Sequence, residues 1–178
     1  TNTGRRLRVW PDTKHFDSPR FSVRQLKHLL RAKAVLCPRL SVSFRDENTG
    51  EAETWCYEDG LKDYLVQSLE GLDRVPEQPF VGNLEGGSEA ASWAVVWLPE
   101  GGEPISESYV NLIPTTQGGT HVNGLRAGLT EAVREFCEFR NLLPRGVKLS
   151  PDDVWGHCSY VLSVKVLAPQ YCGQIKGR

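Results

Sequence analysis

The stretch ESYVNLIPTTQGGTHVNGL, residues 107–125, joins a strand pattern to a helix pattern across a pair of glycines. Its first part, ESYVNLI, predicts a strand. Gly118 and Gly119 allow a tight reversal of the chain, and Thr120 can cap the helix that follows. Apolar residues then recur every three or four positions, which predicts the longest helix of the chain, to about Asn141.

The residues before this stretch predict two helices and several strands. RRLRVW, residues 5–10, alternates as a half-buried strand does. Ser22 and Gln25 fit a capping box, and the helix after them is expected to run to about Lys33. The remaining predictions are a hairpin over residues 40–57, a short helix after Gly60, one strand within residues 71–91, and a central strand at SWAVVWL, residues 92–98.

After the long helix, the sequence predicts a short helix from Ser150 and a strand over residues 158–166. No linker, internal repeat or low-complexity tract divides the chain. The sequence therefore predicts one α/β (α+β) two-layer sandwich, with a sheet of four or more strands and helices packed on a face.

Composition limits the class of protein. The 178 residues are 39% apolar and carry a formal charge of -1, which is typical of a globular domain and gives no overall attraction to a polyanion. No apolar run approaches the about 20 residues that span a bilayer, so we expect a soluble protein without a membrane partner. The five cysteines form no CxxC pair, which favours a reducing cytoplasm and no metal site. Because the chain lacks methionine and begins at Thr1, we expect an internal segment of a longer protein.

Few motifs suggest chemistry. The segment GGTH, residues 118–121, is either an anion cradle at a helix start or a plain strand-to-helix turn with a capping threonine. Neither GxxxxGKS nor GxGxxG occurs. His121 has no nucleophile motif beside it, and Asp152 and Asp153 fit the first turn of a helix. We therefore expect no catalytic residue and no metal site within this chain.

Basic residues recur along the helix that follows Ser22. Arg24, Lys27 and Arg31 lie at helical spacing, on the face away from the leucines. They form either a stripe that follows nucleic-acid phosphates or an ordinary solvated face. Both interpretations are open at this stage.

Five motifs occur in an order that resembles a known family. They are RVWPD, DGLKDYL, YVNLIPTTQGGTHVNGLRAGL, SYVLSVKV and PQYCGQIK. Together they resemble the second domain of the B subunit of bacterial type IIA topoisomerases, over essentially all 178 residues. The stretches FDSPRFSV, AKAVLCP and NLIPTTQGGTH look more like topoisomerase IV than gyrase.

The resemblance implies that residues 1–178 are a single transducer domain. Its fold would be that shared with a ribosomal protein domain and the GHMP kinases, with a left-handed βαβ crossover. The N-terminal GHKL ATPase domain, which holds ATP and Mg²⁺, and the C-terminal DNA-gate domain would lie outside this chain. On its own the chain would then have no turnover, although the whole protein would be an ATP-hydrolysing isomerase.

The family's transducer carries a loop with the pattern QTK that touches the γ-phosphate of ATP. Gln174 and Lys176 match its first and third positions, and Ile175 replaces the threonine. The resemblance thus implies that Gln174 and Lys176 contact the γ-phosphate. Since the ATPase domain would be missing, we also expect the residues after Cys172 to be mobile here.

The implied partners are DNA, the A subunit of topoisomerase IV and a second B subunit, in the bacterial cytoplasm at the nucleoid. The alternative within the family is the transducer domain of the DNA gyrase B subunit. Alternatives of another class are a small-molecule kinase or a nucleic-acid-binding module on the same fold.

Overall fold

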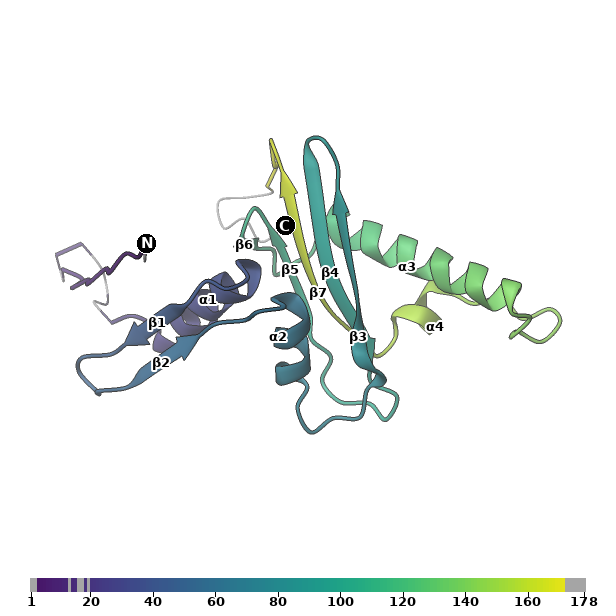
Figure 1. Ribbon diagram of the computed structural model, residues 1–178, viewed down its shortest axis with the longest axis horizontal. Coiled ribbons are helices and arrows are strands. Elements are labelled where there is room, and N and C mark those ends of the chain that lie inside the picture. Colours follow the sequence, from purple (N-terminus) through teal and green to yellow (C-terminus); the bar gives the residue numbers. More distant parts are fainter. Residues whose placement is uncertain (1–2, 13, 16–17, 19, 172–178) are drawn as a thin grey trace.

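The centre of the molecule is a five-stranded mixed sheet with the strand order β3-β4-β7-β5-β6 (Figure 1). The computed structural model describes residues 3–12, 14–15, 18 and 20–171. The strands of the sheet are β3 (Val75–Glu85), β4 (Glu89–Trp97), β5 (Ser106–Val110), β6 (Ile113–Pro114) and β7 (Cys158–Val166). All neighbours are antiparallel except β5 and β7, which are parallel.

Strand β7 is the middle strand of the five-stranded sheet. It pairs with β4 along its whole length, from Cys158 opposite Trp97 to Val166 opposite Glu89. Its other edge pairs with β5. Because successive side chains point to opposite faces, Val161 joins one hydrophobic layer and Leu162 joins the other. Both faces of the sheet therefore require cover.

Helices cover both faces (Figure 1). On one face lie α1 (Val23–Leu36) and α2 (Leu61–Ser68), whose buried residues pack with Val96, Leu98 and Val161. On the other lie α3 (Thr120–Phe139) and α4 (Pro151–Trp155), which pack with Val95, Tyr160 and Leu162. The α/β class with a mixed sheet is confirmed. The sequence predicts two layers, and the structure has three because β4 and β7 are apolar on both faces.

Several predicted elements are confirmed. Residues 40–57 contain the antiparallel hairpin of β1 (Val42–Arg45) and β2 (Ala52–Trp55), in which Val42 lies opposite Trp55. The strand at SWAVVWL is central, since β4 lies between β3 and β7. The short helix after Gly60 and the strand from Cys158 are also present.

The strand predicted at residues 5–10 is wrong. These residues have no regular secondary structure, and Leu7 and Trp10 are 87% and 72% exposed. Arg8 pairs with Glu47 and lies over the Trp10 ring. A strand is stable only when a neighbour pairs with its backbone groups, and the described part of the chain supplies none for this segment.

The start and end of α1 also differ from the prediction. Ser22 is the N-cap residue, but its side chain makes no capping hydrogen bond, so the capping box with Gln25 is wrong. The helix continues past Lys33 to Leu36. Its last residues supply its buried part, because Ala34, Val35 and Leu36 enter the core. Burial of this apolar turn extends the helix beyond the predicted end.

The connection from β5 to β7 contains the long helix predicted from the glycine pair. Gly118 and Gly119 have φ values of 68° and 152°, which favour glycine, and α3 begins at Thr120. The N-cap is Gly119, so Thr120 is the first residue of the helix and not its cap. The left-handed sense of this crossover stays a prediction.

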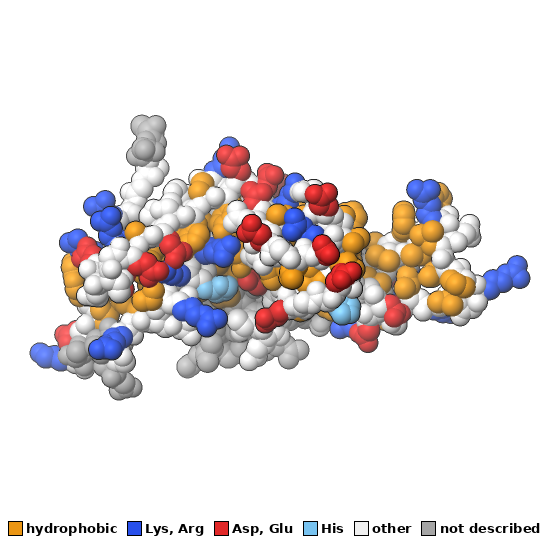
Figure 2. Space-filling model, turned by 90° about the horizontal axis from the view of Figure 1, so that it is seen from below, with side chains coloured by type: hydrophobic (Ala, Val, Ile, Leu, Met, Phe, Trp, Pro, Cys, Tyr) orange, Lys and Arg blue, Asp and Glu red, His pale blue; other side chains and the backbone are white. Residues whose placement is uncertain are grey.

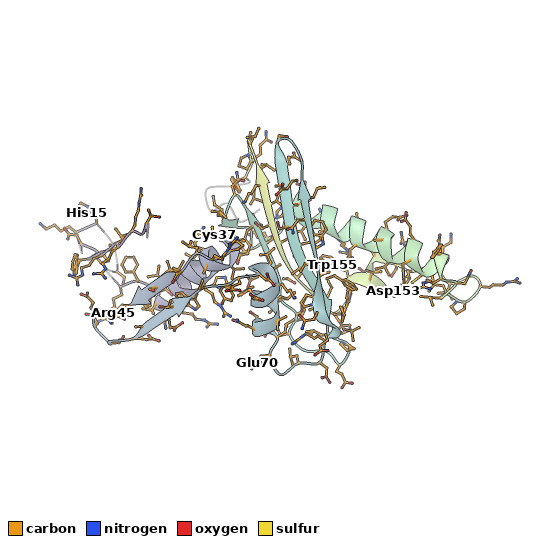
Figure 3. All side chains as sticks on the ribbon, in the orientation of Figure 1. His15, Cys37, Arg45, Glu70, Asp153 and Trp155 are labelled. Atoms are coloured by element: carbon orange, nitrogen blue, oxygen red, sulfur yellow. The ribbon has the colours of Figure 1, made fainter. Side chains whose placement is uncertain are left out.

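Among the described helices, only α4 has an N-cap side chain that makes a capping hydrogen bond. Ser150 Oγ accepts a hydrogen bond from the Asp153 amide, and the Asp153 carboxylate accepts one from the Ser150 amide at 2.7 Å. Pro151 occupies the first helical position. The ring of Trp155, at the end of the helix, is tilted by 41° against the Tyr160 ring, with the ring centroids 5.0 Å apart. Figure 3 labels Trp155 and Asp153 of this helix. The cap therefore fixes a helix that covers the sheet.

Among the described helices, none is long and apolar enough to cross a membrane.

Gly82 provides a test of packing in the β3–β4 pair. A Cβ at Gly82 would lie 2.1 Å from Cζ2 of the Trp93 ring. Because a ring in a packed layer cannot move freely, we expect Gly82→Ala to lower the free energy of unfolding by about 1–3 kcal/mol. Gly87→Ala, where a Cβ meets nothing within 4 Å, is the control. Urea unfolding of both variants measures the difference, and equal stability would contradict the packing described here.

The α4 cap gives a pH-dependent prediction. Hydrogen bonds from Ser150 lower the pKa of Asp153 below its usual 3.8. This stabilisation is present above the unfolded-state pKa and is lost as the pH falls through the folded-state pKa. Ser150→Ala should cost about 1 kcal/mol at pH 7, and less below pH 3.8. Denaturation at pH 7 and in acid checks this, with the exposed Ser88→Ala as control; a cost independent of pH would count against it.

Candidate functional site

The two residues predicted to contact the γ-phosphate, Gln174 and Lys176, lie outside the described residues. So does the segment after Cys172, for which we expect mobility. The description reaches Tyr171. The structure therefore gives the geometry of the sheet corner from which the segment leaves, and that corner is built around the turn between β5 and β6.

This turn places two consecutive residues in the left-handed region. Asn111 has φ 48° and Leu112 has φ 67°. A two-residue hairpin of this kind matches the twist of the strands, and asparagine and glycine are its favoured residues. Asn111 suits it, whereas a leucine with φ above zero is strained by about 1–2 kcal/mol. The turn is therefore held by contacts as well as by local preference.

The Asn111 side chain binds the last residue of β7. Its Nδ2 donates to the Val166 carbonyl at 2.9 Å, and its Oδ1 accepts from the Val166 amide at 2.9 Å. The Asn111 amide donates to the Val164 carbonyl at 2.8 Å. A carboxamide offers one acceptor and two donors, so this side chain satisfies the backbone of β7 beyond the point where β5 ends.

Two more contacts bind the same turn. The Tyr171 hydroxyl donates to the Val110 carbonyl at 2.9 Å. Lys33 of α1 donates through Nζ to the Leu112 carbonyl. The turn thus connects helix α1, the end of β7 and the chain just before the predicted phosphate-contacting segment. We name Val110, Asn111 and Leu112 the corner turn.

Sequence reasoning missed the corner turn. It predicted that ESYVNLI is one continuous strand, because Asn-Leu is a weak hairpin signal compared with Asn-Gly. The available signal was the asparagine itself, a residue that tolerates the left-handed region. The proline that follows Ile113, Pro114, also indicates an edge strand, and β6 lies at the edge of the sheet.

The GGTH segment forms a strand-to-helix turn. The Gly118 amide donates to the Thr115 carbonyl at 2.9 Å. His121 Nε2 lies 2.9 Å from the hydroxyl of Thr115, which is 2.7 Å from the hydroxyl of Ser108. Burial lowers the pKa of His121. The neutral histidine is thereby part of a buried polar cluster that ties α3 to β5, which favours the turn over the anion cradle.

A polar cavity of about 350 Å³ lies beside this cluster. Its lining includes Ser106, Gln117, Asn123 and Tyr160. Ser108 and Thr115, which also line it, are 6% and 2% exposed and use their hydroxyls within the cluster. The histidine and hydroxyls therefore serve packing in this arrangement, and they do not form an accessible nucleophile with a base.

The three basic residues of the predicted stripe, Arg24, Lys27 and Arg31, all lie on α1. Two of them, Lys27 and Arg31, already contact other side chains of this chain. Lys27 pairs with Glu51 and, at 2.5 Å, with Glu53 of the hairpin. These hydrogen bonds raise its pKa. Arg31 Nε donates to the Tyr57 hydroxyl at 2.7 Å and its guanidinium lies over the Tyr64 ring. Arg24 is exposed.

A half-buried carboxylate, Glu107, lies between α2 and β5. Glu107 accepts a hydrogen bond from the Tyr64 hydroxyl and one from the Tyr109 hydroxyl, each at 2.6 Å. Desolvation raises the pKa of both tyrosines. The two phenols therefore remain donors that satisfy Glu107, and the cluster ties α2 to β5.

The predicted acids of α4 lie in its first turn. Asp153 belongs to the cap, and Asp152 pairs with Arg126 of α3. Within the part of the chain that the structure describes, no group of three or more His, Cys, Asp or Glu residues is placed to hold a metal ion. Cys37, Cys56, Cys137 and Cys158 are free thiols.

Exposed hydrophobic side chains gather at the end of α3. Phe139 is 82% exposed, and Leu142 in the following loop is 58% exposed. Figure 2 shows hydrophobic side chains at this end of the molecule. Arg134 holds the returning chain through the Leu149 carbonyl, at 2.9 and 2.7 Å.

Comparison with known proteins identifies close relatives. The DNA gyrase B family model matches residues 60–178. The B subunit of DNA topoisomerase 4 from Pseudomonas aeruginosa is 64% identical over 177 residues, which is 99% of this chain and 28% of that protein. Its counterpart from Escherichia coli is 61% identical over 177 residues, again 99% of this chain and 28% of that protein.

Solved structures share the fold. The topoisomerase IV ATP-binding domain of Francisella tularensis, in complex with a small-molecule inhibitor, matches with a TM-score of 0.76 and 38% identity, covering 94% of this chain and 45% of that one. The 43K ATPase domain of Thermus thermophilus gyrase B, in complex with an aminocoumarin, matches with a TM-score of 0.77 and 25% identity, covering 94% of this chain and 47% of that one.

The chain spans 28% of the length of the curated relatives it matches. The family model nevertheless covers more than half of the chain. The similarity to the Pseudomonas aeruginosa protein covers 99% of the chain. The chain therefore belongs to the DNA gyrase B family.

Proposed function

We propose that this chain is the transducer domain of an ATP-dependent type IIA DNA topoisomerase, of the kind found in the B subunit of topoisomerase IV. The observation that carries the proposal is identity of 61–64% to two topoisomerase 4 proteins over 99% of the chain. The gyrase structure with the same fold is 25% identical. This difference favours topoisomerase IV over the gyrase alternative.

The proposed role is to report whether ATP is bound. A preceding GHKL domain would hold ATP and Mg²⁺, and Gln174 and Lys176 would contact the γ-phosphate. The contact at Tyr171 supports this, since it fixes the chain just before them. Lys176 follows Tyr171 by five residues, and five residues reach at most about 17 Å. The corner turn thus sets the origin from which the segment reaches a neighbouring domain.

The energy of such a contact is of the right size. Two unit charges about 4 Å apart attract by about 4 kcal/mol at an effective dielectric near 20, before desolvation costs. Moving a two-state arrangement from mostly open to mostly closed takes about 5.5 kcal/mol of differential binding. One lysine does not supply this alone, but a multiply charged phosphate that meets Lys176 and also Gln174 is of the right size to bias the arrangement. Ile175 adds no hydroxyl, so the contact rests on these two side chains.

Binding and hydrolysis of ATP would then shift the population of domain arrangements. Through that shift the protein would close on a DNA duplex and direct it through a second duplex cleaved by the A subunit of topoisomerase IV. A second B subunit would complete the gate when ATP binds. The proposed location is the bacterial cytoplasm, at the nucleoid.

Alternatives of another class have weaker support. A small-molecule kinase on this fold needs its own phosphate loop, and the GGTH segment forms a short turn before α3. A nucleic-acid-binding module without nucleotide dependence leaves the matching ATPase structures unexplained. Hydrolysis of ATP by residues 1–178 alone would favour the kinase.

Lys176→Ala in the full-length protein tests the proposal. We expect ADP binding to stay within about twofold of wild type, because ADP lacks the γ-phosphate, while ATP turnover and decatenation fall at least tenfold. Loss of about 1.4 kcal/mol of γ-phosphate stabilisation corresponds to that factor. Arg178→Ala, which removes a cation two positions later in the sequence, is the control. Normal strand passage by Lys176→Ala would refute the proposed role.

The proposed DNA contact at α1 is tested by salt dependence. Arg24 is exposed, whereas Lys27 is already paired with Glu51 and Glu53. Arg24→Gln should therefore reduce the slope of log K for DNA against log salt by about 0.9, the contribution of one phosphate contact. Lys27→Gln should change the slope less. Binding isotherms of the assembled enzyme at several salt concentrations measure the slopes of both variants. An unchanged slope for Arg24→Gln would show that this side of the helix is an ordinary solvated face.

A further inference from the structure

We propose that the outer edge of β3, over residues 80–85, binds an extended segment of a partner protein that carries lysine or arginine side chains. Such a segment would add a further strand to the five-stranded sheet through hydrogen bonds between main chains. The proposal goes beyond the function proposed above and does not depend on the nucleotide contact or on the DNA contact.

Strand β3 is the long edge strand of the sheet. It has 11 residues and pairs on one side only, with β4, whereas β6 at the opposite border has two residues. In the described part of the chain, no strand lies along its outer side. An edge strand leaves a row of main-chain N–H and C=O groups without a partner in the sheet, and these groups can pair with another chain.

The register of the β3–β4 hairpin shows which main-chain groups face outward. The Gly86 amide donates to the Glu89 carbonyl at 2.7 Å, so these two residues form the hydrogen-bonded pair that closes the hairpin. Hydrogen-bonded and non-hydrogen-bonded pairs alternate along an antiparallel ladder. Counting back along the continuous part of the register, residues 84, 82 and 80 bond to β4. The N–H and C=O groups that face the free edge are therefore those of Val81, Asn83 and Glu85.

The second half of β3 lacks the usual protection of an edge. Natural edge strands carry proline, a bulge or charged side chains such as lysine, which hinder pairing with other chains. The first half of β3 contains two prolines, and its register shifts before Phe80. Residues 80–85 contain no proline, no lysine and no register shift. Apolar side chains are also exposed here, since Phe80, Val81 and Leu84 are 59%, 56% and 64% exposed.

The two faces of this edge differ in character. Phe80 lies opposite Val95, which packs with α3 and α4. Because side chains alternate along a strand, Leu84 shares this face with Phe80, while Val81 and Glu85 lie on the other face. An added strand with apolar residues at alternate positions would pack against Phe80 and Leu84, and its remaining side chains would lie beside Glu85.

Charge indicates the chemistry of the partner. No lysine or arginine occurs between Arg74 and Arg126, whereas this stretch contains six glutamates. Three of the glutamates are exposed on β3 and β4, namely Glu77, Glu85 and Glu89. Within the described part of the chain, no lysine or arginine forms an ion pair with these three carboxylates. This edge therefore repels DNA and acidic segments, and it attracts a basic segment.

A peptide probe and hydrogen exchange test the proposal on the full-length protein. The probe is a synthetic peptide of about nine residues, the length of an ordinary strand, in which lysine alternates with valine. One control peptide has glutamate in place of lysine, and another has the lysine sequence with N-methylated main-chain amides, which cannot donate to β3. We expect the lysine peptide alone to bind. It should slow exchange of the outward amides of Val81, Asn83 and Glu85, which exchange quickly without it because they lack a partner in the ladder.

Variants at Asn83 separate main-chain pairing from side-chain contacts. Asn83→Pro removes an outward N–H from the middle of the edge, and proline is tolerated on an edge strand where the N–H faces solvent. Asn83→Ala keeps the N–H and is the matched control. In a calorimetric titration, we expect Asn83→Pro to weaken binding of the lysine peptide about tenfold and Asn83→Ala to change it less than about twofold. Glu85→Gln should weaken binding about threefold at low salt and have no effect at high salt.

The contrary outcomes are distinct. No binding of the lysine peptide at about 1 mM overturns the proposal. Equal binding of the glutamate peptide overturns the basic partner, and equal binding of the N-methylated peptide, or of the lysine peptide to Asn83→Pro, overturns pairing at this edge. Protection of the outward amides that rises with protein concentration, without peptide, would show that a second copy occupies the edge, and this also overturns the proposal.

A second variant keeps the test decisive should Asn83→Pro not fold. Val81→Lys places on the edge a lysine of the kind that protects natural edge strands. A loss of lysine-peptide binding in Val81→Lys, with an unchanged thermal midpoint, supports the proposal. Binding equal to that of the wild-type protein overturns it.

Discussion

The parallel pairing of β5 with β7 is the constraint on which the rest of the structure depends. Parallel neighbours cannot be joined by a short turn, so the chain between Val110 and Cys158 must cross the sheet, and it does so with α3 and α4. Because both strands run in one direction, their carboxyl ends meet at one edge. The chain that follows β7 therefore has to leave beside the turn that follows β5. The sheet topology places the corner turn at this point before any side chain is considered.

Sequence patterns predicted correctly those helices and strands that depend mainly on interactions between residues close together in the chain. The alternation of residues 158–166, the apolar period after Gly119 and the short helix from Ser150 each depend on a few neighbouring residues, and each is confirmed. The prediction failed where a partner decides the outcome. Residues 5–10 alternate as a strand, yet a strand exists only when another strand pairs with it. Likewise, cover on both faces of the sheet follows from where the helices pack, which the periodicity of one helix does not determine.

The candidate site also combines features that the local sequence predicts with features that only the fold creates. Sequence predicted Lys27 on the face of α1 away from the leucines, but its side chain is only 18% exposed whereas Leu29 is 41% exposed. Its charge is neutralised by Glu51 and Glu53 from a hairpin that follows more than twenty residues later. Only the fold brings these carboxylates to the helix. Asn111 was missed because it lay within a predicted strand, where an asparagine suggests little. Its function as a clamp depends on β7, whose last residue is 55 positions away along the chain. Long-range partners of this kind leave no local pattern.

A strained, firmly held corner suits the transmission of a small binding energy. A shift between two domain arrangements draws on a few kcal/mol, and a corner that deformed for about 1 kcal/mol would absorb much of it before the body of the domain moved. Leu112 in the left-handed region costs about that amount, yet its carbonyl meets Lys33 and its side chain meets the core. These contacts favour one geometry of the turn over softer alternatives. Because the corner turn is bound to α1 through Lys33 and to β7 through Asn111, a displacement of the turn would involve both the helix and the sheet.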